Sequence, residues 1–169
     1  MGKKVYKKEQ NNFNYYLKKR VKKKPIAYIL GYKYFWKYKF YVDSSALIPR
    51  PETEHLVEEA LNQIPFKKSI NLLDIGTGSG CVIISILKER QKCKATAIDI
   101  SKDALKVAKI NAKMHHIENK IKFLNIDIDK FKSNKYDLIV SNPPYIKNSA
   151  LKYLDKSIGF EPRLALDGG

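Results

Sequence analysis

The stretch DIGTGSG at residues 74–80 has the composition of a ligand-binding turn between a strand and a helix. Glycine lets the backbone approach a ligand closely, and the first turn of a helix offers N–H groups that have no partner inside the helix. The spacing G-x-G-x-G differs from the dinucleotide fingerprint G-x-G-x-x-G, and no Lys-Ser or Lys-Thr pair closes the turn as in a P-loop. A tight turn that needs glycine for packing alone is the alternative interpretation.

Two carboxylates follow at the ends of the next two expected strands, residues 94–99 and 121–127. In a doubly wound sheet, Asp99 would lie beside the ligand crevice, where it can accept both hydroxyls of a ribose. Its alternative role is that of an acid near the N-terminus of the helix expected after Ser101. Asp127 would lie on the same edge of the sheet and could accept from an adenine amino group. Together with the glycine turn, these acids favour a nucleoside-bearing ligand.

The last expected strand ends in a corner of unusual composition. Residues 136–141 have the pattern of a short buried strand and lead directly into NPPY at residues 142–145. Proline cannot donate a hydrogen bond to a sheet ladder, so the strand must stop there. Ligands of parallel α/β sheets bind outside the carboxyl ends of the strands, so a nucleoside-bearing cofactor would lie beside this corner.

The elements that must position these residues alternate between strands and helices. Strands are expected at 70–75, 94–99, 121–127 and 136–141, and helices at 79–90 and near 102–114, with Ser101 as the cap of the second helix. Near-continuous apolar strands favour a parallel sheet that is covered on both faces. The predicted fold class is therefore α/β, with a doubly wound, mostly parallel sheet.

Two elements are expected before the sheet. Residues 9–24 mix aromatic side chains with a basic face and predict a helix that Pro25 ends. The aromatic run at 31–42 predicts a two-stranded β-hairpin, although its interleaved lysines and tyrosines could also stack on bases. Pro51 is well placed to open a helix, with Glu52 and other acids in its first turns.

Composition limits the class of protein. The length of 169 residues suits about one domain, and the sequence has neither a long apolar run for a membrane span nor a secretory signal. Cys81 and Cys93 lack metal or redox spacing, so we expect no metal and a reducing cytoplasm. The net charge of +16 attracts polyanions in general. Most of the basic residues are lysines, and the sequence is also rich in Ile, Asn and Tyr. Such a composition also arises from an AT-rich coding sequence, so direct nucleic-acid binding is not required.

DIGTGSG followed by NPPY resembles the class I methyltransferases that use S-adenosylmethionine, whose Asn/Asp-Pro-Pro-Tyr/Phe subset methylates planar NH2 groups. Such a nitrogen is a poor nucleophile because its lone pair is delocalised. Two acceptors that hold its N–H bonds orient the lone pair toward the sulfonium methyl and stabilise the developing charge. The resemblance implies that the Asn142 side chain is one acceptor and the Pro143 carbonyl the other, while Tyr145 packs on the planar group. No general base need act before the transfer.

Residues 31–54 narrow this resemblance. Gly31, Phe35, Phe40 and Val42, the stretch LIPRPETE at 47–54 and FEPRLAL at 160–166 are similar to the release-factor glutamine methyltransferases. These enzymes methylate the side-chain amide of the glutamine in the Gly-Gly-Gln loop of peptide chain release factors and leave S-adenosylhomocysteine. Ribosomal-protein glutamine methyltransferases share NPPY, but PRPETE points away from them. The implied cofactor contacts are Gly76, Thr77, Gly78, Ser79, Gly80, Asp99, Asp127 and Asn142. The implied substrate contacts are Asn142, Pro143, Pro144 and Tyr145.

The resemblance also divides the chain. Residues 1–24 would be a remnant of an N-terminal helical domain, 25–51 a hairpin and linker, and 52–169 a partial methyltransferase domain. Ile128 stands where family members often carry an aromatic residue against the adenine. The chain ends at LALDGG, before further strands of the family's sheet, so we expect a C-terminally truncated member.

Two other functions stay open from the residues alone. The same corner would serve a nucleic-acid methyltransferase that acts on adenine or guanine amino groups, and the positive charge favours it. A truncated chain could also be an inactive fragment that at most binds the cofactor. The LIPRPETE stretch, and the lack of a recognisable target-recognition domain, favour the protein substrate.

Overall fold

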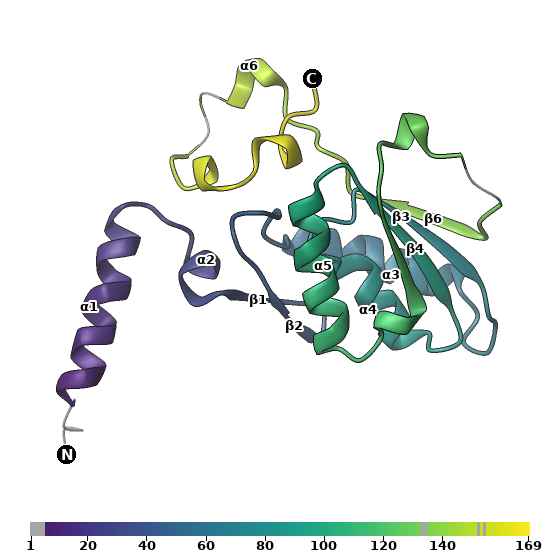
Figure 1. The fold of residues 1–169 in the computed structure, drawn as a ribbon, viewed down its shortest axis with the longest axis horizontal. Helices are drawn as coiled ribbons and strands as arrows, with labels where there is room; N and C mark the ends of the chain where they lie inside the picture. Colours follow the sequence, from purple (N-terminus) through teal and green to yellow (C-terminus); the bar gives the residue numbers. More distant parts are fainter. Residues whose placement is uncertain (1–5, 133–134, 152, 154) are drawn as a thin grey trace.

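Apolar segments from the middle of the chain form a four-stranded parallel sheet, which is the centre of the computed structural model (Figure 1). The structure describes residues 6–132, 135–151, 153 and 155–169. The strands are β3 (Asn71–Ile75), β4 (Lys94–Asp99), β5 (Ile121–Asn125) and β6 (Leu138–Ser141). A separate antiparallel hairpin consists of β1 (Tyr32–Phe35) and β2 (Tyr38–Tyr41). The predicted α/β fold class and the predicted hairpin are confirmed.

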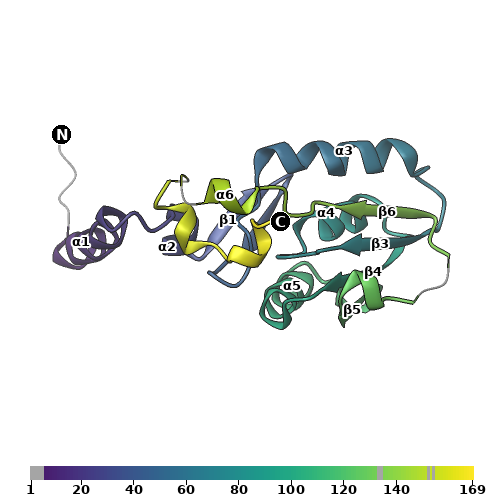
Figure 2. The ribbon, with the colours of Figure 1, turned by 90° about the horizontal axis from the view of Figure 1, so that it is seen from above.

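The order of the strands creates a switch point beside β3. The sheet has the order β5-β4-β3-β6, so the chain runs outward from β3 to β5 and then returns to the far side of β3 (Figure 2). Parallel strands place their carboxyl ends on one edge, and such sheets bind ligands where the order reverses. The Ser141 hydroxyl donates to the Ile75 carbonyl at 3.0 Å, which joins the ends of the two strands that flank this point.

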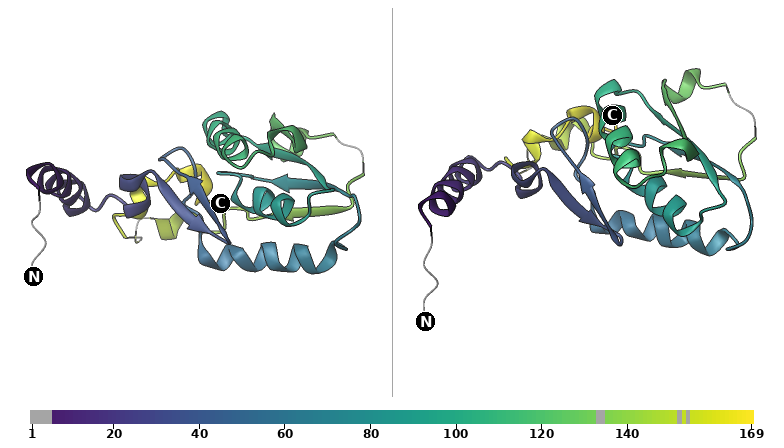
Figure 3. Two further views of the ribbon diagram at one scale, coloured as in Figure 1. Left: turned by 90° about the horizontal axis from the view of Figure 1, so that it is seen from below. Right: turned by 60° about the horizontal axis from the view of Figure 1, so that its bottom comes forward.

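Three helices cover one face of the sheet: α3 (Glu54–Gln63), α4 (Cys81–Glu89) and α5 (Lys102–Met114) (Figure 3). The middle helix, α4, is buried from Cys81 to Leu87, because it lies between its neighbours and the sheet. A helix that is apolar all round needs such a position. The Ser101 hydroxyl accepts from the Ala104 N–H at 3.1 Å, which confirms the predicted cap of α5.

The opposite face of the sheet differs from the prediction. In the part of the chain that the structure describes, this face receives no α-helix, only the connection from β5 to β6 with its short helix η3 (Ile128–Lys130) (Figure 1). Successive side chains of a strand point to opposite faces. Val140 therefore packs in the core, whereas the neighbouring Ile139 is 56% exposed. The expectation of a sheet covered on both faces holds for one face only.

The N-terminal helices also differ from the prediction. Helix α1 (Lys7–Val21) buries none of its side chains. Pro25 does not simply end this helix; it is the N-cap of a second helix, α2 (Ile26–Leu30), which the sequence analysis missed. Pro51 opens a short helix η1 (Pro51–Thr53) rather than α3 itself. No helix within the described residues is long and apolar enough to cross a bilayer.

Side chains from three helices hold the hairpin against the helical layer that covers the sheet. The buried Asn111 amide of α5 accepts from the Tyr41 N–H at 2.7 Å and donates to the carbonyls of Tyr41 and Ser79 at 3.0 and 2.9 Å. Glu89 of α4 accepts from Tyr38 and Trp36, and Glu54 of α3 accepts from the Trp36 N–H at 2.9 Å. The hairpin is therefore fixed at both ends of α4, through Ser79 and Asn111 near its start and through Glu89 at its end.

Replacing Asn111 with Leu should destabilise the protein by on the order of 3 kcal/mol. The apolar side chain has a similar volume but leaves the backbone groups of Tyr41 and Ser79 without partners, at about 1–3 kcal/mol per buried group. Urea unfolding measures the change. Lys109→Leu, at an exposed position of the same helix, is the control and should stay within about 0.5 kcal/mol. Equal effects for the two variants would contradict this role of Asn111.

Candidate functional site

The stretch DIGTGSG forms the turn from β3 into α4, and its three glycines serve two purposes. Gly76, Gly78 and Gly80 all have left-handed backbones, with φ of 70°, 55° and 79°. A Cβ on Gly80 would lie 3.0 Å from Ile84 and 3.2 Å from Ala108, so Gly80 allows α4 and α5 to pack closely. A Cβ on Gly76 would meet no atom within 4 Å. The packing interpretation thus applies to Gly80, whereas Gly76 and Gly78 border open space.

A cavity of about 360 Å³ lies over the carboxyl ends of the strands. Its walls come from the glycine turn, from the ends of β4, β5 and β6, and from the loop before η1. The predicted site residues that line it are Gly76, Thr77, Gly78, Ser79, Asp99, Asp127, Asn142, Pro143 and Pro144. Gly80 and Tyr145 are not among its lining residues. The structure therefore brings together most of the residues that were predicted from four separate segments.

Asp99 lines the cavity, and the predicted role beside the helix that begins after Ser101 is confirmed, whereas its contact with a ribose stays a prediction. Its Oδ2 accepts from the Gly78 N–H at 2.9 Å, and its Oδ1 accepts from the Ser101 N–H at 2.8 Å. These bonds fix the carboxylate between the glycine turn and the start of α5. A carboxylate has about four acceptor positions, so it retains capacity for a ligand in the cavity.

Asp127 also has a structural partner. Its Oδ1 accepts from the Asp129 N–H at 3.1 Å and caps η3. The next residue, Ile128, lines the cavity and is 45% exposed. The two side chains can act together on a flat heterocycle, since the carboxylate can accept from its polar edge and the apolar side chain can pack on its face.

Asp74 is a buried carboxyl at the floor of the cavity. It accepts a hydrogen bond of 2.6 Å from the Thr77 hydroxyl. Burial raises the pKa of Asp74 to about 7; the Thr77 hydrogen bond opposes this shift and the charge of Asp99 adds to it. Burial likewise raises the pKa of the neighbouring Cys81 thiol to about 12. The floor of the cavity therefore carries little charge below neutral pH.

The NPPY corner is held by contacts from segments that precede and follow it in the chain. The Asn142 side-chain nitrogen donates to the Thr53 hydroxyl at 3.2 Å, which turns the amide oxygen away from Thr53. After the corner, the Ile146 N–H donates to the Leu166 carbonyl at 3.1 Å and the Gly168 N–H donates to the Ile146 carbonyl at 2.9 Å. The C-terminal segment thus braces the corner directly.

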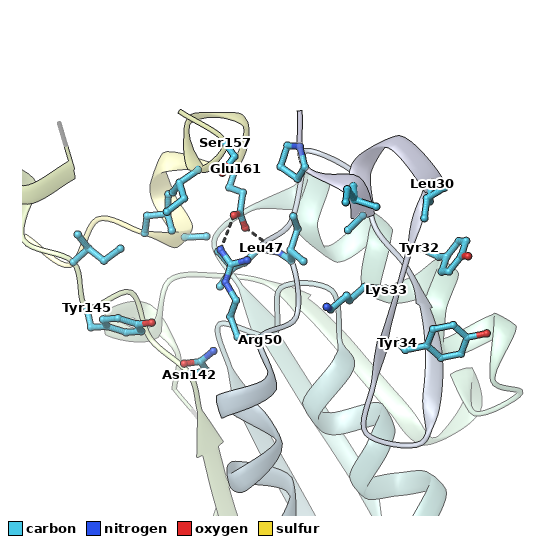
Figure 4. A pocket seen from close by; sticks show the side chains of 18 of the residues that line it. Leu30, Tyr32, Lys33, Tyr34, Leu47, Arg50, Asn142, Tyr145, Ser157 and Glu161 are labelled. Carbon is cyan, nitrogen blue, oxygen red and sulfur yellow. Dashed lines mark hydrogen bonds and ion pairs between the residues drawn. The ribbon is translucent and has the colours of Figure 1, made fainter. Parts of the chain in front are cut away.

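A second cavity, of about 750 Å³, meets the first at Asn142 and Pro143. It lies between α2, the hairpin, the loop before η1 and the segment 157–166. Tyr145 lines this second cavity and is 78% exposed (Figure 4). Asn142 therefore stands where two cavities join, and Tyr145 faces only one of them.

Arg50 and Glu161 stand at this junction, and sequence reasoning assigned neither a role. The Arg50 guanidinium pairs with the buried Glu161 carboxylate at 2.5 Å, and the Ile48 N–H donates to the same carboxylate at 3.0 Å (Figure 4). Thr53, the partner of Asn142, was missed as well. These residues lie within LIPRPETE and FEPRLAL, two of the stretches that carry the family resemblance.

The parallel sheet with a cavity at its carboxyl edge is the Rossmann-like class I methyltransferase fold. Of the solved structures, a candidate RNA methyltransferase from Pyrococcus horikoshii superimposes with a TM-score of 0.51 at 22% identity, over 59% of this chain and 47% of that one. Residues 53–157 match the methyltransferase small domain. The chain therefore belongs to the methyltransferase small domain family.

The curated relatives are more specific. The chain is 40% identical over 158 residues to the release factor glutamine methyltransferase of Caulobacter vibrioides, covering 92% of this chain and 55% of that protein. It is 43% identical over 163 residues to the release factor glutamine methyltransferase of Coxiella burnetii, covering 95% of this chain and 57% of that protein. The chain thus spans about half the length of the curated relatives it matches.

The raised pKa of Asp74 predicts a pH dependence of stability. In the unfolded chain this carboxyl ionises near 3.8, whereas in the folded protein it keeps its proton up to about pH 7. Across this window the folded state binds the extra proton, so the stability from this group falls as pH rises from 4 to about 7 and then levels off. Relative to Asp74→Asn, wild-type protein should therefore lose stability between pH 5 and pH 8.

Urea unfolding at several pH values between these limits measures this difference. Asp103→Asn is the control, because the hydrogen bond from Lys106 lowers the pKa of this exposed carboxyl, so its titration lies below the window. A constant difference between wild type and Asp74→Asn across the range would contradict a neutral buried carboxyl at position 74.

Proposed function

We propose that this chain transfers a methyl group from S-adenosylmethionine to the side-chain amide nitrogen of the glutamine in the Gly-Gly-Gln loop of peptide chain release factors. The observation that carries the proposal is the position of Asn142. Its amide is fixed by Thr53 at the junction of two cavities, one suited to a nucleoside and one open to a larger substrate. The names of the curated relatives support the same reaction.

The chemistry of the smaller cavity supports the cofactor. Gly76 and Gly78 leave space that a Cβ would occupy, so the backbone of the turn can approach the ligand closely. Asp99 would accept the ribose hydroxyls, and Asp127 would accept from the adenine amino group, with Ile128 against the ring. When bound, S-adenosylmethionine supplies an electrophilic methyl group on a sulfonium. The protonated form of Asp74 would leave the positive charge of the turn's N–H groups available to the ligand.

The corner would prepare the amide nitrogen for attack. Asn142 Oδ1 and the Pro143 carbonyl would each accept one N–H of the substrate amide, so that its lone pair points toward the cofactor. These acceptors strengthen their bonds as positive charge develops on the nitrogen, and such bonds accelerate the chemical step. Tyr145, which is exposed in the larger cavity, would pack on the planar amide. The extra proton leaves after the methyl group has been transferred.

The larger cavity supports a polypeptide substrate. Its lining is mostly apolar and aromatic and includes the exposed side chains of Ile26, Leu30 and Tyr34. An exposed apolar surface beside a reactive corner is typical of a protein-binding site. A nucleic-acid substrate would use the same corner, so methyl transfer to a release factor and to an oligonucleotide should be measured side by side. Transfer to the oligonucleotide alone would overturn the assignment of the substrate.

Replacing Asn142 with Ala should lower the rate of methyl transfer by about 10²-fold or more, because one oriented acceptor at the reacting nitrogen is lost. Single-turnover transfer of radiolabelled methyl to a release factor measures this rate. Calorimetric titration with S-adenosylhomocysteine checks that cofactor binding changes only modestly. Asn119→Ala, at an exposed position of the short helix η2 (Glu118–Lys120) outside both cavities, is the control and should retain the wild-type rate. A near-wild-type rate for Asn142→Ala would exclude its role as an acceptor.

Thr53 should act on the reaction through Asn142. Thr53→Val has nearly the same shape but cannot accept from the Asn142 amide, so the amide loses its fixed orientation. We expect kcat to fall by about fivefold with little change in KM, since an interaction of about 1 kcal/mol is lost at the reacting group. Thr53→Ser keeps the hydroxyl and should restore most of the rate. If Val and Ser behave alike, the hydroxyl has no positioning role.

A further inference from the structure

We propose that the outer edge of β1 is a docking site for an extended segment of the polypeptide substrate, which binds as an added third strand of the hairpin. The proposal rests on the proposed function, because it specifies how the chain around the modified glutamine is held. The docking site would consist of the backbone groups of Tyr32 and Tyr34 and the larger cavity beside them. Asn142 lines the same cavity.

The register of the hairpin decides which backbone groups point outward. Lys33 pairs with Phe40, and the Val42 N–H donates to the Gly31 carbonyl at 3.2 Å. In an antiparallel ladder, hydrogen-bonded pairs alternate with pairs whose N–H and C=O groups point away from the partner strand. Residues 31, 33 and 35 therefore bond to β2. The N–H and C=O groups of Tyr32 and Tyr34 point away from it.

The outer edge of β2 is already occupied, and its occupants confirm this register. The outward groups of Tyr41 bond to the Asn111 side chain of α5 at 2.7 and 3.0 Å. The outward carbonyl of Lys39 lies 2.9 Å from Nε2 of His115, also on α5. The edge of β1 differs, since within the described residues no hydrogen bond engages the outward groups of Tyr32 or Tyr34.

The alternation of inward and outward backbone groups continues past the end of β1 and shows which segment its outer edge faces. The next N–H in the outward series belongs to Trp36, and it donates to the Glu54 carboxylate at 2.9 Å. Glu54 follows Thr53, and the Thr53 hydroxyl holds the Asn142 amide. The outer edge of β1 therefore faces the segment that positions the proposed acceptor, and Glu54 closes the end of the edge nearest to it.

The larger cavity runs along this edge. Tyr32, Lys33 and Tyr34 all line it, although successive side chains of a strand point to opposite faces. Three consecutive lining residues thus indicate that the cavity follows the strand edge rather than one face. Asn142 and Tyr145 line the same cavity, on the other side of Arg50 from the hairpin (Figure 4). A segment on β1 would reach the corner without leaving the cavity.

An extended polypeptide is the occupant that this edge suits. Strand addition uses main-chain hydrogen bonds for affinity and pockets for alternate side chains for specificity. Such a site holds a chain that has no fixed structure of its own and presents one of its side chains to the corner. Pairing with a second copy is disfavoured, because β1 has only four residues, carries Lys33 and has Tyr32 beneath the ammonium of Lys39. Short, charged edges resist self-association.

A proline substitution distinguishes the contribution of the outward N–H to peptide binding from that of the tyrosine side chain. Tyr34→Pro removes the outward N–H and leaves the ladder bonds of Lys33 and Phe35, and proline is accepted on edge strands whose N–H faces outward. Tyr34→Val removes the same ring but keeps the N–H. A Gly-Gly-Gln-containing peptide should bind Tyr34→Pro about fivefold to tenfold more weakly than it binds Tyr34→Val, as expected for the loss of one hydrogen bond. The two variants should bind S-adenosylhomocysteine equally.

Amide hydrogen exchange of the wild-type protein gives a second test that does not depend on a variant. On addition of the peptide, exchange of the Tyr32 and Tyr34 N–H groups should slow at least fivefold. Lys33 and Phe35, which are bonded within the hairpin, should change little. This alternation along β1 is specific to strand addition, and it decides the question if Tyr34→Pro does not fold.

The outcomes separate this inference from the proposed function. If the peptide binds and is methylated but the Tyr32 and Tyr34 amides are not protected, the docking site is wrong and the proposed function stands. Equal peptide affinity of the folded Pro and Val variants would overturn the docking site in the same way. If wild-type protein neither binds nor methylates a Gly-Gly-Gln-containing peptide or a release factor, the proposed function fails and the inference fails with it.

Discussion

The arrangement of the two cavities depends on how the buried carboxylate of Glu161 is paired. A buried charge is costly unless it is paired and hydrogen-bonded, and removal of one partner leaves the other uncompensated. Here the partners are the Arg50 guanidinium and the Ile48 N–H, which lie more than a hundred residues earlier in the chain. Both belong to the loop that forms the wall between the cavities. Burial, together with the charge of Glu161, also raises the pKa of Tyr28, so Tyr28 remains a neutral donor to the Ala46 carbonyl at the base of this loop.

The polar groups of the smaller cavity hold one another in place through hydrogen bonds. Asp74 accepts from Thr77, and Asp99 joins the glycine turn to the start of α5. Groups that are held in place need little reorganisation when they meet a ligand, and this makes their interactions more effective. The larger cavity is built differently, from short elements and exposed aromatic side chains. Rigid strand ends thus form one side of Asn142 and an open, apolar surface forms the other.

The sequence predicted features that depend on neighbouring residues. The glycine turn, the Ser101 cap, the bounds of β4 and α5 and the hairpin follow from local composition and spacing, and the structure confirms them. Helix α2 was missed because Pro25 suits both the end of one helix and the N-cap of the next. Thr53 and Glu161 were missed for another reason: their partners are 89 and 113 residues away. No local pattern encodes such a pairing. The division of the chain into three domains and the roles of the site residues remain predictions.

The rigidity of the NPPY corner does not come from the sheet alone. Strand β6 pairs with β3 on one side, and in the described part of the chain no strand pairs with its other side. An edge strand by itself would hold a corner weakly, because only one ladder restrains it. Here the restraint comes from outside the sheet. Thr53 fixes the Asn142 amide, and Gly168 packs so closely on Pro144 that a Cβ would lie 2.8 Å from its carbonyl oxygen. Segments from before and after the sheet therefore converge on the corner, where one fixes the Asn142 side chain and the other fixes the backbone.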